Sequence, residues 1–501
     1  MFFIFLHRWQ DQPLHRLRSA FYATLLSIFS TGFALAAPFQ HVLLLSVDGL
    51  HAEDLQWVLQ QQPHSQLAQW AAQGTVFSEA RTPVPADSFP GLAALLTGAP
   101  PAVTGLWYDV AYDRQLSPPG SDCTTHGTIV RYDETIDGAN GGLNPELLPR
   151  DPAQHCQPVF PHQFLLVNSV FDVLHQQHLP TAWMDKHPAY EFVSGHQGNA
   201  VDDLYTPEIG ANYEGKTTLN NQIARSLDKT EQYDADKIHA LMQQLQGQGH
   251  DGQHPGPVPA LLGLNLQAVS VAQKLYGYLP HRLPSPALAQ ALLATDALLR
   301  QLQDTLSAQH LDAATLIIVT AKHGNSPINS QKIRHIEEKQ LRAAIESAAP
   351  GALVHLIADD GALIWLKSAT ARPAVMQYLK QHHQQLGIHR VLDSQGTVLH
   401  WPANNRTPDL VLEADYGVIY GAAHTRKKAE HGGFNDEDRH VALLIRDGYP
   451  AQQIHQSVST LQVAPTILSA LGLNPEALDS VQQHLCRNLP ALHWIPPARI
   501  D

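Results

Sequence analysis

The chain has 501 residues, of which 44% are hydrophobic and 16% are charged. This composition is typical of a globular protein with a large core and excludes an intrinsically disordered chain. The formal net charge is -14 at pH 7, so the chain lacks the basic excess with which proteins bind nucleic-acid polymers. We therefore expect no DNA or RNA partner.

The first 36 residues are predicted to be a signal peptide. Three arginines precede an apolar run over residues 20–35, which ends in the small-x-small cleavage pattern Ala34-Leu35-Ala36. The run is shorter than the ~20 residues of a membrane-spanning helix, which favours cleavage over an uncleaved anchor. We therefore expect a periplasmic or secreted protein, with no membrane span after cleavage and one domain over residues 37–501.

The first predicted element of the mature chain is a buried strand. The run His41–Val47 is almost wholly apolar, as in a parallel strand covered on both faces, and it ends at Asp48-Gly49. Open α/β sheets bind ligands at the carboxyl ends of their strands, so Asp48 is predicted to face a ligand. A helix over residues 55–73 follows.

The clearest local motif covers residues 85–98. Its sequence is Pro-Ala-Asp-Ser-Phe-Pro-Gly-Leu-Ala-Ala-Leu-Leu-Thr-Gly, in which Pro90 suits the first turn of a helix and Ser88 stands at or just before the helix start. There the hydroxyl faces free backbone N–H groups and the positive end of the helix dipole, which favour a phosphoryl or sulfuryl group. The alternative is that Ser88 only caps the helix, which is the commoner use of such a serine.

The periodicity breaks down between about residues 107 and 260. We interpret this range as an irregular insertion that caps the sheet edge, and not as a second domain. It contains Cys123 and Cys156, whose pairing an oxidising compartment favours, although three independent thiols remain an equal alternative. Polar clusters at residues 184–187 and 201–203 are interpreted as solvated charge pairs.

Two further buried strands are predicted in the second half of the chain. One is Thr315–Thr320, which runs into Ala-Lys-His323-Gly324, and the other covers residues 440–445. Helical patterns separate the strands, including residues 286–309, and another helix is expected near residues 462–473. Strands alternating with helices predict an α/β fold with a largely parallel sheet.

The candidate chemistry centres on the serine. A serine hydroxyl is a weak nucleophile at neutral pH, so a metal ion or a base must lower the cost of ionising it. Asp48 and the histidines of two His-Gly dipeptides, His323 and His431, are candidate partners. Zinc accepts carboxylate and imidazole ligands together, and it would both activate the hydroxyl and stabilise charge on the transferred group.

These motifs together resemble the alkaline phosphatase superfamily, and specifically its type I phosphodiesterase and nucleotide pyrophosphatase branch. The matching segments fall in the family's order and span most of the mature chain. They are residues 44–49, 88–98, 320–324, 431–434 and 464–468. The resemblance implies a doubly wound sheet sandwiched by helices and a small-molecule phosphate ester substrate, preferably a diester. It also implies that Ser88 is the covalent nucleophile and that Asp48, Ser88, His323 and His431 bind a divalent metal, with zinc expected in one or two copies.

The sequence departs from the family pattern at three places. Lys322 replaces the aspartate of the family's Asp-His-Gly, and a protonated lysine cannot bind a metal ion. The family's Pro-Asp-x-x-Gly-His segment should fall near residues 261–274, where only Asn265 or Gln267 offers an amide oxygen, a weaker zinc ligand. Asp109 stands where the family has an asparagine that holds the phosphate, and its charge would repel an anionic substrate.

We hypothesise that two of these departures are coupled. Lys322 would replace the charge of one metal ion and pair with Asp109. Together with Asn265, these two residues are the candidate substrate-binding residues. The alternatives are a phosphomonoesterase, a phosphonate or sulfate ester hydrolase on the same fold, and a degenerate member that binds without turnover. The retained Ser88 at the helix start favours an enzyme.

Overall fold

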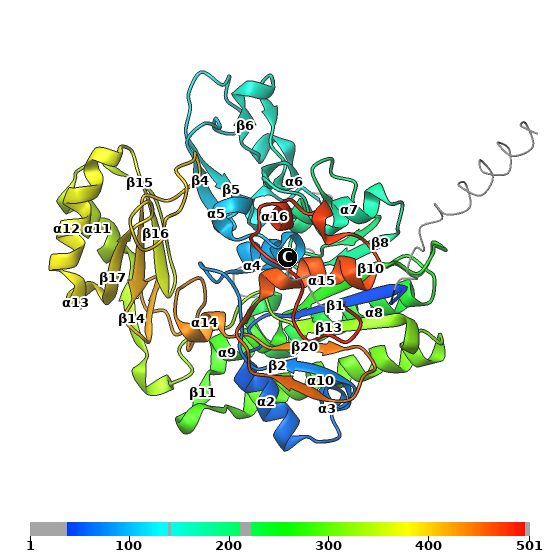
Figure 1. Cartoon of the computed structure of the whole chain (residues 1–501). Helices are drawn as coiled ribbons and strands as arrows, with labels where there is room; N and C mark the ends of the chain where they lie inside the picture. Colours follow the sequence, from blue (N-terminus) through cyan, green and yellow to red (C-terminus); the bar gives the residue numbers. More distant parts are fainter. Residues whose placement is uncertain (1–37, 139–141, 211–221, 496–501) are drawn as a thin grey trace, which may run out of the picture. The chain divides into compact units, whose positions relative to one another are not determined.

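The computed structural model describes residues 38–138, 142–210 and 222–495 (Figure 1). The predicted signal peptide lies outside these residues. In the described ranges no helix is both long enough and apolar enough to cross a membrane.

The main element is an eight-stranded sheet with the order β21-β2-β20-β13-β1-β10-β8-β9. Only β20 runs antiparallel to its neighbours, so the predicted α/β fold with a largely parallel sheet is confirmed. The strands predicted at residues 41–47 and 315–320 match the structure, whereas the third begins at residue 443. The strands are β1 (His41–Val47), β2 (Gly74–Phe77), β8 (Thr181–Met184), β9 (Asp203–Tyr205), β10 (Leu261–Leu266), β13 (Thr315–Thr320), β20 (Leu443–Arg446) and β21 (Gln452–Ile454).

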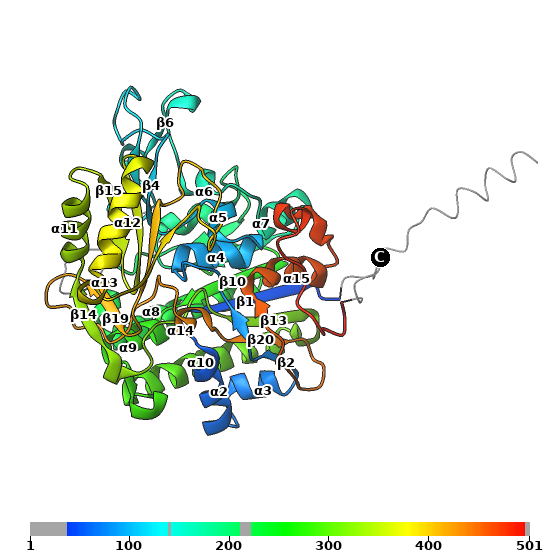
Figure 2. The ribbon, with the colours of Figure 1, turned by 60° about the vertical axis from the view of Figure 1, so that its left-hand side comes forward.

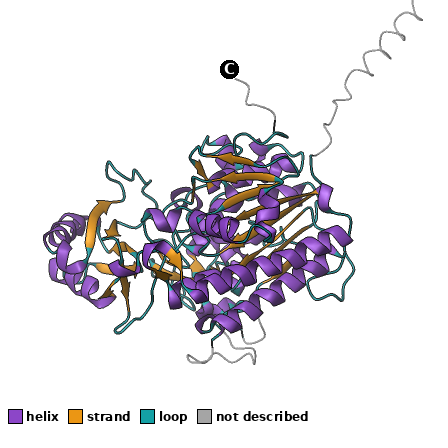
Figure 3. Cartoon of the chain, turned by 90° about the horizontal axis from the view of Figure 1, so that it is seen from below, coloured by secondary structure: helices purple, strands orange, loops and turns teal. Residues whose placement is uncertain are grey.

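Helices cover both faces of this sheet, because its central strands are mostly apolar and are buried at almost every position. In β1, Leu43 and Leu45 point to one face and Val42 and Leu44 to the other. The first face packs against long helices that cross the strands in Figure 3. These helices are α2 (Ala52–Gln61), α3 (Gln66–Ala71), α8 (Leu227–Leu245), α9 (Ala268–Tyr276) and α10 (Pro286–Ala308).

The other face packs against three helices that include the serine motif. They are α4 (Ser88–Thr97), α7 (Val170–Gln176) and α15 (Val463–Ala470). Figure 2 shows α4 lying over β1 and β10. The helix predicted over residues 55–73 is instead two helices, because Pro63 interrupts it and Ser65 caps α3 by accepting the N–H of Ala68.

A second sheet was not anticipated from the sequence. Four antiparallel strands in the order β15-β16-β18-β17 carry helices on one side (Figure 1). On the other side they pack against Trp107 and Tyr108. The strands are β15 (Leu353–Ala358), β16 (Gly361–Leu366), β17 (Ile388–Asp393) and β18 (Leu410–Ala414), and the helices are α11 (Glu338–Ala348), α12 (Arg372–Gln381) and α13 (His383–Leu386).

The segment predicted as a cap is less uniform than expected. Its second half supplies β8 and β9 to the large sheet and α7 and α8 to its faces. The irregular part therefore lies mainly before α7. There Cys123 and Cys156 form a disulfide, and Cys486 is unpaired and half-buried.

Candidate active site

The site lies where the carboxyl ends of parallel strands meet. Asp48 follows β1, Lys322 and His323 follow β13, and Lys186 follows β8. Because these strands run in the same direction, their final residues reach the same edge of the sheet. Helix α4 brings Ser88 to this edge.

Ser88 is free to react because another residue caps its helix. Asp87 is the N-cap of α4, and its carboxylate accepts the N–H of Phe89. The alternative function of Ser88 as the cap is therefore excluded. Helix α4 comes unusually near β13, since a Cβ on Gly91 would lie 2.3 Å from the carbonyl oxygen of Lys322. Only glycine allows this approach, which brings Ser88 to His323.

His323 is oriented to accept the proton of Ser88. Its Nε2 lies 3.0 Å from Ser88 Oγ, and its Nδ1 lies 2.8 Å from the carbonyl oxygen of Gly324. A carbonyl only accepts, so Nδ1 carries the hydrogen and Nε2 presents its lone pair to the hydroxyl. Burial, followed by the neighbouring His431, holds the pKa of His323 well below its usual value, so the ring is neutral.

Lys186 places an ammonium group against the same hydroxyl. Its Nζ donates to Ser88 Oγ over 2.9 Å and to Asp48 Oδ2 over 3.2 Å. Burial disfavours this charge, but the carboxylates of Asp48 and Asp185 outweigh it and raise the pKa of Lys186. Burial likewise disfavours the Asp48 carboxylate, and Lys186 and Lys322 outweigh it, so the pKa of Asp48 lies well below its usual value. Asp48 and Lys186 are therefore a charged pair at neutral pH.

A second ion pair lies behind the first. Lys322 Nζ lies 2.9 Å from both carboxylate oxygens of Asp185, and both side chains are fully buried. The hypothesis that Lys322 pairs with Asp109 is wrong, because the ammonium of Lys322 pairs with Asp185, the residue that follows β8. Asn265 is also fully buried, and its amide lies 3.4 Å from Asp185. Of the three predicted substrate-binding residues, only Asp109 lines a cavity with Ser88.

His431 lies on the other side of His323. The two rings stack with centroids 3.7 Å apart and an interplanar angle of 1°. His431 Nε2 lies 3.3 Å from Asp87, and its Nδ1 lies 3.1 Å from Glu430. Burial and Lys274 disfavour a charge on this ring, but Asp87 and Glu430 outweigh them and raise the pKa of His431. The stacked pair therefore combines a neutral imidazole with one that favours protonation.

A cavity of about 230 Å³ opens in front of Ser88. It shares Lys186, Lys274, Lys427 and His431 with an adjoining cavity of about 760 Å³. Its acidic lining residues are Asp87, Asp109, Asp359 and Glu430. Tyr108 donates a hydrogen bond to Asp359, which lies in the turn between β15 and β16, so the second sheet contributes to the cavity.

Asp109 does not carry the negative charge expected from its sequence position. Burial, together with the carboxylates of Asp87, Asp133 and Asp359, raises the pKa of Asp109 to about 8. At neutral pH its carboxyl group is therefore mostly protonated and has a hydrogen to donate. In this respect it resembles the amide of the family's asparagine.

The described residues do not fit a divalent metal ion. The predicted ligands Asp48, Ser88 and His323 lie together, but Lys186 Nζ already bridges Asp48 and Ser88. Of these three predicted ligands, only Asp48 has a buried oxygen, Oδ1, without a hydrogen-bond partner. Across residues 38–138, 142–210 and 222–495, no group of three or more His, Cys, Asp or Glu side chains is arranged to hold a metal ion. Zinc requires about four such donors.

Sequence reasoning missed the two most important additions to the site. Residues 184–187 were interpreted as solvated, which is wrong for Asp185 and Lys186, since Asp185 is fully buried and the Lys186 side chain is 14% exposed. Both directly follow a buried strand, as Asp48 does. That signal was present in the apolar run Thr181–Met184, but the run is only four residues long.

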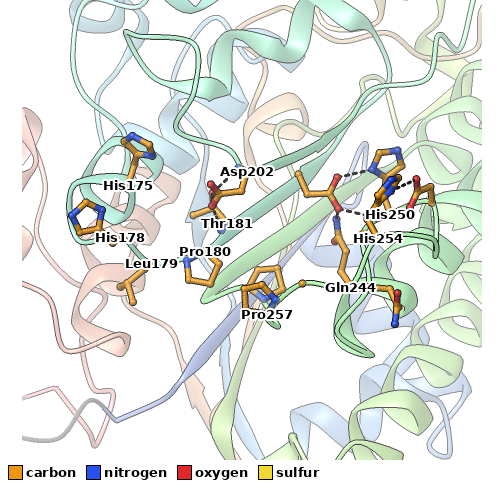
Figure 4. A pocket seen from close by; sticks show the side chains of 16 residues that line it. His175, His178, Leu179, Pro180, Thr181, Asp202, Gln244, His250, His254 and Pro257 are labelled. Carbon is orange, nitrogen blue, oxygen red and sulfur yellow. Dashed lines mark hydrogen bonds and ion pairs between the residues drawn. The ribbon is translucent and has the colours of Figure 1, made fainter.

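Another cavity, of about 620 Å³, lies away from this site (Figure 4). It is lined by Pro180, directly before β8, and by Pro259, two residues before β10, so it lies at the opposite edge of the sheet. Within its lining, Asp203 accepts hydrogen bonds from Gln244 and from the backbone N–H of His250. It brings together none of the predicted site residues.

Comparison with known families gives one extensive match. A family model described as type I phosphodiesterase / nucleotide pyrophosphatase matches residues 42–437. Human ectonucleotide pyrophosphatase/phosphodiesterase family member 7 is 22% identical over 228 residues, which are 42% of this chain and 46% of that protein. The rat protein of the same name is 23% identical over 190 residues, 36% of this chain and 40% of that protein. The chain thus matches less than half the length of these curated relatives.

Solved structures share the fold over most of the chain. Murine ectonucleotide pyrophosphatase / phosphodiesterase 5 has a TM-score of 0.59 at 15% identity, covering 87% of this chain and 96% of that one. The alkaline phosphatase PafA has a TM-score of 0.61 at 14% identity, covering 86% and 96%. The fold is therefore that of the alkaline phosphatase superfamily.

Proposed function

The chain belongs to the type I phosphodiesterase / nucleotide pyrophosphatase family, and we propose that it hydrolyses small-molecule phosphate esters, preferably diesters, with Ser88 as the nucleophile. The observation that carries this function is the setting of Ser88 Oγ. It lies between an imidazole nitrogen at 3.0 Å and an ammonium group at 2.9 Å, at the first residue of α4. A general base and a cation are what an attacking serine hydroxyl needs.

The cations around the cavities support an anionic substrate. Lys186, Lys274 and Lys427 line both cavities, and Arg225 and Arg426 line the larger one. Glu430 pairs with both Lys274 and Lys427, so one carboxylate faces two ammonium groups there. A phosphate ester with an anionic leaving group, such as a nucleotide, fits this charge. An inactive form of the murine relative has been solved in complex with AMP.

Export of the mature protein is part of the same proposal. The first 36 residues carry the pattern of a cleaved signal peptide. The disulfide between Cys123 and Cys156 supports an oxidising compartment, the periplasm or the exterior.

A panel of chromogenic esters tests the activity. Bis-p-nitrophenyl phosphate, p-nitrophenyl phosphate, a p-nitrophenyl phosphonate and p-nitrophenyl sulfate carry the same leaving group, so their relative kcat/KM values compare the transferred groups. We expect the diester to be hydrolysed fastest. If the panel shows no release of p-nitrophenol above the uncatalysed rate, the proposed function is rejected.

The protonation of Asp109 predicts a specific pH dependence. Its carboxyl group holds a proton below a pKa of about 8 and loses it above that pH, so a new negative charge then faces the anionic ester. We expect kcat/KM to fall as the pH rises through 8, whereas Asp109→Asn, which cannot ionise, keeps its activity to higher pH. Identical alkaline limbs in the parent and the variant would contradict this assignment.

A further inference from the structure

We propose that Lys186 replaces a catalytic metal ion, so that Ser88 attacks phosphorus with His323 as its base and without a divalent cation. This inference rests on the proposed function and departs from the metal chemistry that the family resemblance implies. The geometry of four side chains carries it.

The first step of the argument is the position of the ammonium group. A metal ion that activates a serine contacts its oxygen and is held by protein ligands, of which a carboxylate is one. Lys186 Nζ does both, since it lies 2.9 Å from Ser88 Oγ and 3.2 Å from Asp48 Oδ2. The Lys186 backbone N–H donates to Asp185 over 2.9 Å, which fixes the start of the side chain.

The second step is the charge balance. Two buried carboxylates, Asp48 and Asp185, are paired with two ammonium groups, Lys186 and Lys322. The strand ends are therefore already neutral. A divalent ion bound at Asp48 would lie beside two like charges in a buried site, where Coulomb repulsion is only weakly screened.

The third step is the route of the proton. The hydrogen on His323 Nδ1 is held by the Gly324 carbonyl, so Nε2 takes the proton from Ser88. Ser88 Oγ then forms a bond to phosphorus, and the bond from phosphorus to the leaving oxygen breaks. The leaving oxygen, which lies opposite Oγ in an in-line displacement, keeps that electron pair and takes a proton from the solvent, while His323 keeps the proton of Ser88. Lys186 keeps all its protons and stabilises the charge on Oγ.

The second half of the reaction uses the same groups. Water attacks the phosphoserine from the side opposite Oγ and releases a proton to the solvent. The bond between phosphorus and Oγ breaks, and Oγ recovers the proton from His323. The buried Tyr190 lines the same cavity as Ser88, and its hydroxyl is placed to donate to a phosphoryl oxygen.

The test measures Ser88 directly as well as turnover. A fluorophosphonate transfers its phosphonyl group to an activated serine with loss of fluoride, and intact-protein mass spectrometry gives the labelling rate. We compare the full mature protein, Lys186→Met and the control Lys339→Met, whose lysine is exposed and pairs with Glu337. Each protein is assayed before and after EDTA, with its metal content determined by elemental analysis.

We expect Ser88 to be labelled at the same rate with and without EDTA, in protein that holds far less than one metal ion per chain. Lys186→Met should be labelled about 100-fold more slowly, as when one preorganised donor to a reacting oxygen is removed, and Lys339→Met at the parental rate. Stoichiometric metal whose removal stops labelling would overturn the inference. So would parental labelling of Lys186→Met.

A second variant separates catalysis from folding. Lys186→Met alone leaves the Asp48 carboxylate buried without its main partner, so Lys186→Met/Asp48→Asn removes both charges together. If the double variant melts like the parent and is still labelled slowly, the effect belongs to catalysis, whereas parental labelling overturns the inference.

Ser88 labelling without ester turnover would reject only the proposed function, and metal-dependent turnover would reject only this inference.

Discussion

Ser88→Ala is expected to lower kcat for phosphoester hydrolysis by at least about 10³-fold, the scale of loss when a covalent nucleophile is removed. The alanine removes the hydroxyl that lies 3.0 Å from His323 Nε2 and 2.9 Å from Lys186 Nζ. Asp87 still caps α4 in the variant, so the fold should be unchanged. Steady-state kinetics on the best ester of the panel, together with thermal melting, measure both effects.

Ser46→Ala is the matched control for this substitution. Ser46 lies in β1, two residues before Asp48. Its side chain is buried, as that of Ser88 is, and its hydroxyl has no hydrogen-bond partner. We expect the control to retain nearly parental kcat. Equal kcat values in the parent and Ser88→Ala would remove Ser88 from the mechanism and would favour a family member that binds without turnover.

Asp185→Ala is expected to lower the free energy of unfolding by about 3–5 kcal/mol, the usual cost of leaving a buried charge without its partner. Both carboxylate oxygens of Asp185 hold the ammonium of Lys322, which is 0% exposed. Burial already lowers the pKa of Lys322 in the presence of Asp185, so loss of the carboxylate favours a neutral amine still further. Urea unfolding monitored by circular dichroism measures the difference.

The double variant Asp185→Leu/Lys322→Met provides the control. Replacing a whole buried ion pair by apolar residues is often neutral or stabilising, so we expect the double variant to be nearer to the parent than Asp185→Ala is. If Asp185→Ala unfolds at the parental urea concentration, the pair contributes little and the buried charge is compensated elsewhere.

The sequence predicts those parts of the fold whose signals are local. Apolar runs located β1 and β13 to the residue, and helical periodicity located α10 to within one residue. The turn chemistry of residues 85–98 placed Ser88 at a helix start. In each case a few neighbouring residues determine the conformation.

The partners of these residues depend on strand order, which the sequence does not specify. Lys322 follows β13 and Asp185 follows β8, and two strands lie between β13 and β8 in the sheet. The pairing of Lys322 could therefore not be deduced from spacing. Lys186 was missed for a different reason, because the strand before it has only four residues. The second sheet was missed because its short strands lie among helices in residues 338–414 and resemble the α/β pattern around them.

The ammonium of Lys186 also has a consequence for where such a protein can work. A bound zinc ion exchanges with its surroundings and is lost to competing chelators, whereas a lysine is attached to the chain by covalent bonds. Synthesis of the polypeptide alone then supplies the cation beside Ser88. A hydrolase built in this way needs no metal delivery, so it should stay active in media where zinc is scarce.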